Sequence, residues 1–369
     1  MIHMYAFKTL FNQRGRFIIT SFGIALCIIL MLFLLAIFRG VATGCMRYIN
    51  ESDADLWILQ KHTSNIMRGT SLLMMNQGNI IKEIPGVKQV APVFFFSSSV
   101  KTPDALATVR LTGYDINTGV GGPPELYKGN GLENDSQIIL DHSFAFKYKI
   151  HLGDKITLNE DTLTVKGLSS GTNMGVYQYA FITLKKAQSL IGFPGIVSFF
   201  QVRIEEGSDP LKIAGLIRSS LTDVTVLDRK TFLQNNQHEM ESGFLPMLYV
   251  IAIIGSIVLT AILSLILSVY IMEQRRDYTI IKALGAPAGF IPGIVLQQAL
   301  ILAVSGMLIA VILFFPLLKA VEKVAPEVTT ESSVFQILAV FAGLIIISLV
   351  SSFFPVLKLK HIYPLELFK

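Results

Sequence analysis

The sequence has little charge and few cysteines. Only 15% of the 369 residues are charged, 52% are hydrophobic, and the mean hydropathy is +0.57. An ordinary soluble domain carries about 25% charged residues. The two cysteines are Cys27 and Cys45. On one continuous helix they would lie about 27 Å apart, too far for a disulfide with each other. The composition therefore indicates a membrane protein without a disulfide framework.

Motifs for nucleotide hydrolysis, metal catalysis and nucleophilic catalysis are also absent. The chain has no G-x-x-x-x-G-K-[ST], H-E-x-x-H, C-x-x-C or G-x-S-x-G sequence. Its histidines, at positions 3, 62, 142, 151, 238 and 361, show no metal-ligand spacing. Asp141, His142 and Ser143 are consecutive, but neighbouring side chains on a strand point to opposite faces, which argues against a triad. We expect no catalytic residue, cofactor or metal on this chain.

Four runs without charged residues are long enough to cross a membrane as helices. About 20 apolar residues span a hydrocarbon core of about 30 Å. The predicted spans are residues 17–38, 244–271, 290–318 and 334–357. The first exceeds the roughly 7–15 apolar residues of a signal peptide, so that a cleaved signal is the weaker interpretation. The spans hold no Asp, Glu, Lys, Arg or His, which argues against an ion-coupled carrier, pump or channel.

Basic residues gather in three segments that an even number of spans places on one side of the membrane. These are Lys8, Arg14 and Arg16, then Arg275, Arg276 and Lys282, then Lys358, Lys360 and Lys369. The positive-inside rule assigns this side to the cytoplasm. Residues 39–243 and the short loop 319–333 then face outward, and the cytoplasmic tail is 358–369. Basic cytoplasmic edges favour contact with membrane lipid and argue against nucleic acid.

The polar segments have their own predicted structure. Residues 1–16 are expected to form an amphipathic cytoplasmic helix with Met4, Phe7 and Phe11 on one face. The large outer domain, 39–243, mixes short strand and helix patterns and is predicted to be α+β, with helical stalks at both ends. Pro92 indicates a sheet edge or bulge. A Gly/Pro-rich connector, 117–131, opens an expected second lobe at about 118–200.

Two sets of residues stand out next to the spans. In the second span, small polar residues recur every four positions, and we expect them to form a helix-packing face within the chain or across a dimer. They are Ser256, Thr260, Ser264 and Ser268. The second set lies in the segment 272–289, which contains EQRRDYTIIKALGA. A solvated loop accounts for its basic residues but not for its helically spaced apolar ones, which are typical of a helix that docks in a groove.

The sequence MEQRRDYTIIKALGAPAGFI resembles the segment between the second and third spans of MacB/FtsX-type ABC transporter permeases. PGVKQVAPV and KIHLGDKITL with LTVKGL resemble parts of the outer domain of that family, and YPLELFK resembles its C-terminus. The four-span layout also agrees. The chain has no fused ATPase domain and is more similar to split permeases of the DevC, LolC and HrtB kind.

The resemblance implies a permease that is not itself an enzyme and that works with a separate ATP-hydrolysing subunit. The expected partners are a cytoplasmic ABC ATPase dimer that binds ATP and Mg, a second copy of the permease in a homodimer, and a membrane-fusion adaptor protein. The expected location is the bacterial cytoplasmic membrane, with both termini cytoplasmic and the large domain periplasmic or extracellular. ATP-driven closure of the ATPase would be relayed to the outer domain, a mode called mechanotransmission, to export or extract a lipophilic or amphiphilic cargo.

The same resemblance assigns the ATPase-coupling residues. They are Glu273, Arg275, Arg276, Asp277, Ile280, Ile281, Lys282, Leu284 and Gly285. The apolar members would fill a groove of the ATPase, so that Ile281→Asp is expected to uncouple it. The sequence departs from the family at Asp277-Tyr278-Thr279, where Glu-Ile-Gly is usual, and a bulky Tyr278 implies a different groove. The alternatives are a non-transporting, FtsX-like activator of a cell-wall hydrolase and a membrane-tethered receptor or enzyme.

Overall fold

The computed structural model describes residues 2–12, 14–102, 106–173, 178–287 and 289–359. The chain divides into two compact units. We call residues 1–37, 245–320 and 332–369 the helical unit, and residues 38–244 with 321–331 the α/β unit. Among the described residues, four helical segments are long and apolar enough to cross a membrane: Arg14–Asn50, Leu245–Glu273, Phe290–Val324 and Val334–Phe353. They agree with the four predicted spans.

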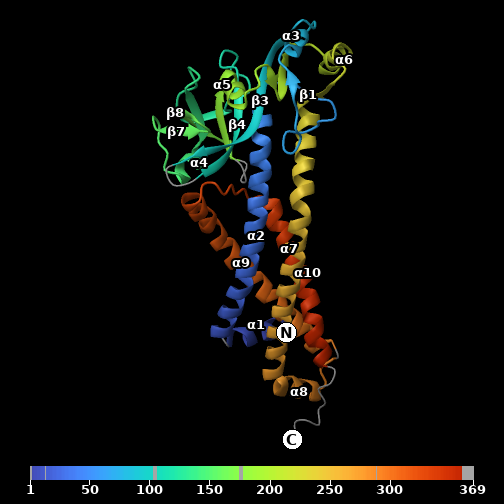
Figure 1. Ribbon diagram of the computed structural model, residues 1–369. Helices are drawn as coiled ribbons and strands as arrows, with labels where there is room; N and C mark the ends of the chain where they lie inside the picture. The colour runs from blue at the N-terminus through green and yellow to red at the C-terminus, as the bar shows by residue number, and fades with distance from the viewer. Residues whose placement is uncertain (1, 13, 103–105, 174–177, 288, 360–369) are drawn as a thin grey trace. The chain divides into compact units, whose positions relative to one another are not determined.

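Long helices form the helical unit, and two of them continue into the α/β unit. The helices are α1 (Ile2–Asn12), α2 (Arg14–Asn50), α7 (Arg229–Glu273), α8 (Arg275–Ala283), α9 (Phe290–Val324) and α10 (Val334–Leu359) (Figure 1). α2 and α9 approach closely at Gly306. A Cβ added there would lie 2.6 Å from Cγ2 of Ile24, so that no larger residue fits. The Ser21 and Ser305 hydroxyls, 2.8 Å apart, are hydrogen-bonded to each other at the same contact.

The N-terminal helix α1 is amphipathic, as predicted, but its buried face is formed by other residues. Ala6 and Leu10 are fully buried in the core of the helical unit. Phe7 and Phe11 are exposed, and their rings stack with centroids 4.2 Å apart. The side chain of Met4 lies outside the described residues. Because exposed aromatic rings suit a membrane interface, the arrangement fits a helix lying against lipid.

The α/β unit contains a ten-stranded sheet and a separate two-stranded one. Its strands are β1 (Leu56–Gln60), β2 (Leu73–Met74), β3 (Val87–Lys101), β4 (Leu106–Tyr114), β5 (Glu125–Gly129), β6 (Gln137–Asp141), β7 (Lys155–Leu158), β8 (Asp161–Ser170), β9 (Tyr179–Thr183), β10 (Ile196–Val197), β11 (Phe199–Ile204) and β12 (Val224–Asp228). The order is β12-β1-β11-β3-β4-β9-β6-β8-β5, and β7 pairs with β3 and β8. β2 pairs with β10.

The inserted segment that is expected to form a second lobe shares the sheet of the rest of the unit. β9 lies within residues 118–200 and pairs in parallel with β4, so that Leu111 is opposite Ala180. β7, from the same segment, pairs with the end of β3. One hydrophobic core contains side chains from both predicted lobes. Main-chain pairing of this kind joins segments that are distant in the sequence, so that the local hydrophobic pattern does not predict it.

Successive side chains of β1 point to opposite faces of the sheet, and both faces are buried. Leu56 and Ile58 of β1 belong to one core, and Trp57 and Leu59 to another. The first core is covered by short helices: α3 (Gln77–Lys82), α4 (His142–Lys147), α5 (Leu184–Ile191) and α6 (Pro210–Ser220). The second is covered by the end of α2 and the start of α7.

Residues at the ends and edges of elements have the geometry that their local chemistry favours. Gly192 ends α5 in the left-handed conformation, with φ of 74°. Asp209 caps α6, its side chain accepting a hydrogen bond from the Leu211 N–H. Pro92 lies inside β3 and pairs only with β11 there, since the β4 ladder begins at Val93. Pro92 is therefore at a local edge, where its missing N–H costs no ladder bond.

Candidate functional site

The short helix α8 follows α7 after a single non-helical residue, Gln274, and is anchored by its inner face. The Tyr278 hydroxyl donates to Oε1 of Gln274 at 2.7 Å, and only 1% of Tyr278 is exposed. The expectation that Tyr278 meets the groove of a partner is wrong, because its ring belongs to the buried core of the helical unit. The departure from the family pattern at this position is thus an internal packing feature.

The opposite face of α8 carries the exposed residues. Helical periodicity places Arg276, Asp277, Ile280 and Leu284 on the side away from Tyr278. Ile280 is 43% exposed and Leu284 is 83% exposed. Two exposed apolar side chains beside charged ones are suited to docking on a partner, and that role stays a prediction. We call these four residues the α8 face.

The remaining predicted coupling residues have other positions. Ile281 is half-buried and packs against the core of the helical unit. Arg275 and Lys282 are exposed. Gly285 has a φ of 88°, which favours glycine and lets the chain turn after α8. The coupling role of all these residues stays a prediction, but Ile281→Asp would also disturb the packing of α8.

Glu273, another predicted coupling residue, already has a partner within the chain. Its carboxylate pairs with the guanidinium of Arg16. The same guanidinium lies 4.9 Å from the centroid of the Tyr270 ring. A cation over an aromatic face adds to the attraction of an ion pair. Arg16, which the sequence marked only as a basic edge residue, therefore fixes the end of α7 from which α8 starts.

The Ser/Thr stripe of α7 is half-buried rather than central to the helix packing. The hydroxyls of Ser256 and Thr260 donate to carbonyl oxygens one turn back, each at 2.7 Å. Ser268 is 9% exposed. The buried stripe of this helix consists of leucines: Leu259, Leu263 and Leu267. The Ser/Thr stripe flanks this leucine stripe, and its use between two copies of the chain stays a prediction.

Aromatic contacts hold the ends of the two long helices in the α/β unit. Tyr48 of α2 stacks on Tyr179 of β9, with ring centroids 5.3 Å apart. Phe232 of α7 stacks on Trp57 of β1 at 4.5 Å. All four are at most 2% exposed. Because buried aromatic pairs contribute about 0.5–1.5 kcal/mol beyond their area, the helix ends are tightly joined to the sheet.

The segment 321–331, which joins α9 to α10, is held by the α/β unit. Nδ2 of Asn173 donates to the backbone oxygens of Glu327 at 2.9 Å and Pro326 at 3.3 Å. Nζ of Lys147 lies 3.3 Å from the Glu327 carboxylate. A Cβ on Gly40 would lie 2.3 Å from the backbone oxygen of Thr329. We call this segment the α9–α10 strap.

A buried polar network stands behind the Asn173 contact. The Asp141 carboxylate accepts from the Ser143 N–H at 2.9 Å, the Phe144 N–H at 3.3 Å and the Thr172 hydroxyl at 2.7 Å. The Ser143 hydroxyl also donates to Asp141 and accepts from Asn173 Nδ2 at 3.1 Å. This network orients the amide that binds the strap.

Asp141, His142 and Ser143 lie where a strand ends and a helix begins, rather than along a strand. Asp141 ends β6 and caps α4, so that Asp141 and Ser143 are in contact. His142 instead lies beside Tyr127, with ring centroids 4.7 Å apart. The Asp–Ser pair is a helix cap without the imidazole that a triad requires. Within the described residues, no three His, Cys, Asp or Glu side chains are grouped as metal ligands.

We expect Asn173→Ala to release the strap while leaving the sheet folded. The variant loses both carbonyl contacts, and Lys147 alone is a partly exposed ion pair of small energy. The measurement is the labelling rate of a cysteine introduced at Val328, with Asn134→Ala, an exposed turn residue, as the control. Faster labelling in Asn173→Ala is expected. Equal rates in all three proteins would show that the strap is held by other contacts.

Comparisons with known proteins agree with this architecture. Residues 17–220 match the family model of the MacB-like periplasmic core domain, and residues 249–364 match that of the FtsX-like permease C-terminal region. The first match alone covers more than half of the chain.

Relatives match along nearly their whole lengths. An uncharacterized ABC transporter permease of Methanocaldococcus jannaschii is 24% identical, over 98% of this chain and 96% of the relative. A protein named as the hemin transport system permease HrtB, of Staphylococcus epidermidis, is 21% identical, over 98% and 97%. The crystal structure of the periplasmic region of MacB from Actinobacillus actinomycetemcomitans has a TM-score of 0.41 at 16% identity, over 52% of this chain and 96% of that one. The chain belongs to the MacB/FtsX-type family of ABC transporter permeases.

Proposed function

We propose that this permease relays ATP-driven motion of a separate cytoplasmic ATPase to its large domain, which faces the outside. The observation that carries the proposal is the α8 face, where Leu284 and Ile280 are exposed although Tyr278 anchors the same helix from behind. A rigidly held helix with an exposed apolar face transmits a push from a partner to the helices that it follows. The ATPase binds ATP and Mg; this chain contributes only the docking surface.

The continuity of two helices supports the relay. α2 runs from Arg14 to Asn50 and α7 from Arg229 to Glu273, so that each passes from the helical unit into the α/β unit. Their ends are packed in the second core of the sheet. When such a helix tilts, its end moves the part of the α/β unit in which that end is packed. The strap adds a third connection, because it joins α9 and α10 and is bound by Asn173.

We propose a lipophilic or amphiphilic cargo, exported or extracted from the membrane. Within the described residues the predicted spans hold no charged side chain to carry an ion. Hemin, for whose transport the Staphylococcus epidermidis relative is named, is an amphiphilic compound. Phe94, Phe199 and Phe200 are sheet core and do not line an open lipophilic site, because they are at most 4% exposed.

The transport proposal is tested in cells that produce the permease together with its ATPase. Hemin is the first probe, and the measurement is cell-associated hemin with and without the permease. We expect lower hemin with the permease, and hemin at the level of permease-free cells when the catalytic glutamate of the ATPase is replaced. Unchanged hemin, together with activation of a cell-wall hydrolase, would favour the FtsX-like regulator.

We also propose that two copies assemble as a homodimer, with an adaptor protein as a further partner.

Ser264→Leu tests the packing of the Ser/Thr stripe, because a larger side chain keeps helices apart where small residues allow close approach. We expect a shift from dimer to monomer in size-exclusion chromatography with light scattering. Leu265→Ile, at an adjacent exposed position, is the control. A dimer of unchanged stability in Ser264→Leu would exclude this face.

A further inference from the structure

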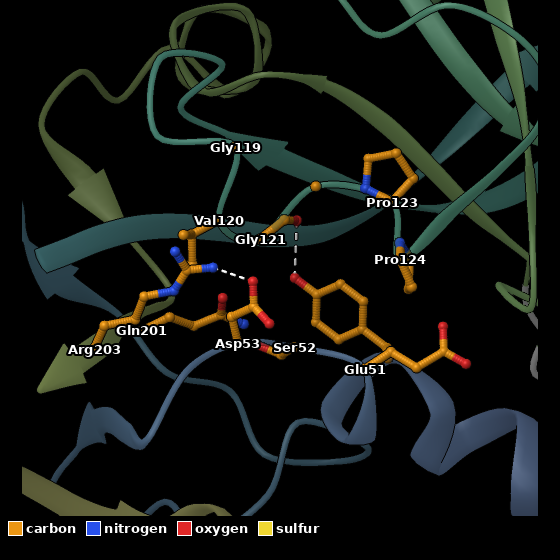
Figure 2. A pocket seen from close by; sticks show the side chains of 12 residues that line it. Glu51, Ser52, Asp53, Gly119, Val120, Gly121, Pro123, Pro124, Gln201 and Arg203 are labelled. Atoms are coloured by element: carbon orange, nitrogen blue, oxygen red, sulfur yellow. Dashed lines mark hydrogen bonds and ion pairs between the residues drawn. The ribbon is translucent and has the colours of Figure 1, made fainter. Parts of the chain in front are cut away.

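A polar cavity of about 130 Å³ lies in the α/β unit, where the chain leaves α2. Its walls are the segment after Tyr48, the loop from Gly119 to Pro124, and Gln201 and Arg203 of β11 (Figure 2). One ordered water needs only about 15 Å³. The cavity therefore has room for a small organic group, and no role in the proposed ATPase coupling accounts for it.

The loop wall is built tightly. Gly119 and Gly121 have φ values of 69° and 86°, which favour glycine. A Cβ on Gly121 would lie 2.5 Å from Cγ2 of Val93, so that no larger residue fits there. The Tyr48 hydroxyl donates to the Gly121 backbone oxygen at 3.0 Å. The loop is thus fixed against β3 and α2.

The Gln201 carboxamide is the unusual feature of the cavity. Gln201 is 1% exposed, and neither its Oε1 nor its Nε2 has a hydrogen bond of ordinary geometry among the described residues. In a looser contact, Nε2 of Gln201 donates to the Tyr48 hydroxyl, which gives its own proton to Gly121; the second N–H and Oε1 of Gln201 stay without a partner. Nε of Arg203 is also buried without a partner. Buried unpaired polar groups are costly, so that an occupant that pairs them is favoured.

The charges around the cavity are already paired. The Arg203 guanidinium pairs with Asp53, as Figure 2 shows. Arg47 pairs with Glu51 at 2.6 Å. The groups that remain without a partner therefore carry no net charge. They are N–H donors of Gln201 and Arg203 and the carbonyl acceptor of Gln201. A neutral group that offers both an acceptor and a donor is complementary to this set, and a free carboxylate or ammonium is not.

We propose that this cavity binds a neutral amide group, present either in a small molecule or in the main chain of an extended peptide. The amide oxygen accepts from the N–H groups of Gln201 and Arg203, and the amide N–H donates to Oε1 of Gln201. The cavity lies beside the end of α2, so that an occupant contacts the segment through which that helix joins the sheet. The proposal does not depend on ATPase coupling.

The test uses the full-length protein in detergent and saturation-transfer NMR with N-methylacetamide as the probe. Methyl acetate has nearly the same shape but lacks the N–H, and is the probe control. We expect saturation transfer to N-methylacetamide and a signal about fivefold weaker for methyl acetate, as the loss of one hydrogen bond implies. Stronger binding of acetyl-triglycine amide would identify a peptide chain as the source, and equal binding a small molecule.

Two variants test the assignment of the groups. Gln201→Met keeps the side-chain length and removes the amide, and Arg203→Lys keeps the pair with Asp53 and removes Nε. Arg203→Lys loses one hydrogen bond and is expected to lower the N-methylacetamide signal about fivefold, and Gln201→Met loses two and is expected to lower it about 25-fold. Gln237→Met, at an exposed position of α7, is the matched control and should bind as the wild type does.

Thermal unfolding separates binding from folding. Gln201→Met should unfold at or above the wild-type temperature because it removes an unpaired buried carboxamide. If Gln201→Met does not fold, Arg203→Lys alone decides the matter. No saturation transfer in the wild type would show that the cavity holds only water and would overturn the proposal. A signal that persists in both variants would overturn it as well.

Discussion

Replacing Leu284 by Asp is expected to weaken binding of the ATPase by about 100-fold. Leu284 is 83% exposed, so that the aspartate costs the permease itself little. Docking in an apolar groove would bury its charge, and an unpaired buried charge costs about 3 kcal/mol or more. The measurement is the amount of ATPase that co-purifies with the permease from mild detergent.

The matched control for this prediction is Val324→Asp. Val324 is 82% exposed and also lies at the end of a helix, but it belongs to the α9–α10 strap. The variant introduces the same charge at the same exposure and should retain the ATPase. Loss of ATPase in both variants would indicate a general effect of the charge. Full retention in Leu284→Asp would mean that α8 does not couple to an ATPase.

Asp141→Ala is expected to destabilise the α/β unit by about 3 kcal/mol. The carboxylate is 1% exposed and accepts bonds from Ser143, Phe144 and Thr172. Its removal deletes a helix cap, worth about 1 kcal/mol, and leaves buried donors unpaired at about 1–3 kcal/mol. Urea unfolding of the full chain measures the loss through Trp57, the single tryptophan, which is fully buried in this unit.

Asp209→Ala provides the comparison, since Asp209 also caps a helix. It accepts one bond, from the Leu211 N–H at 2.9 Å, and is exposed. Water replaces that bond in the variant, so that we expect a loss of about 1 kcal/mol or less. Similar losses in the two variants would mean that the buried network adds nothing beyond an ordinary cap.

The features that the sequence predicted well depend on local chemistry. Spans follow from the length of apolar runs, and Pro92 marks a local sheet edge because it has no N–H to donate. The sharing of one sheet by both expected lobes was not predicted, because the pairing of β4 with β9 joins segments about 70 positions apart. β5 was missed as well, since all its residues are exposed and show no hydrophobic alternation.

The candidate site shows the same limit. The sequence marked the segment around α8, but the side on which each residue lies depends on what packs behind it. Tyr278 was expected outside and is buried against the helical core, whereas Ile280 is exposed. Asn173 carries no motif, and its contact with Glu327 joins positions that only folding brings together. Gln201 lies in an ordinary strand pattern, and only its burial without a partner marks it.

Photo-crosslinking from position 284 tests the central claim most directly. A benzophenone amino acid at Leu284 of the full-length permease is activated in intact cells, and the crosslinked protein is identified by mass spectrometry. Position 324 serves as the equally exposed control. The relay mechanism predicts a crosslink from 284, and not from 324, to a cytoplasmic protein with an ABC ATPase sequence. Crosslinks from 284 to lipid alone, or to no ATPase, would contradict it.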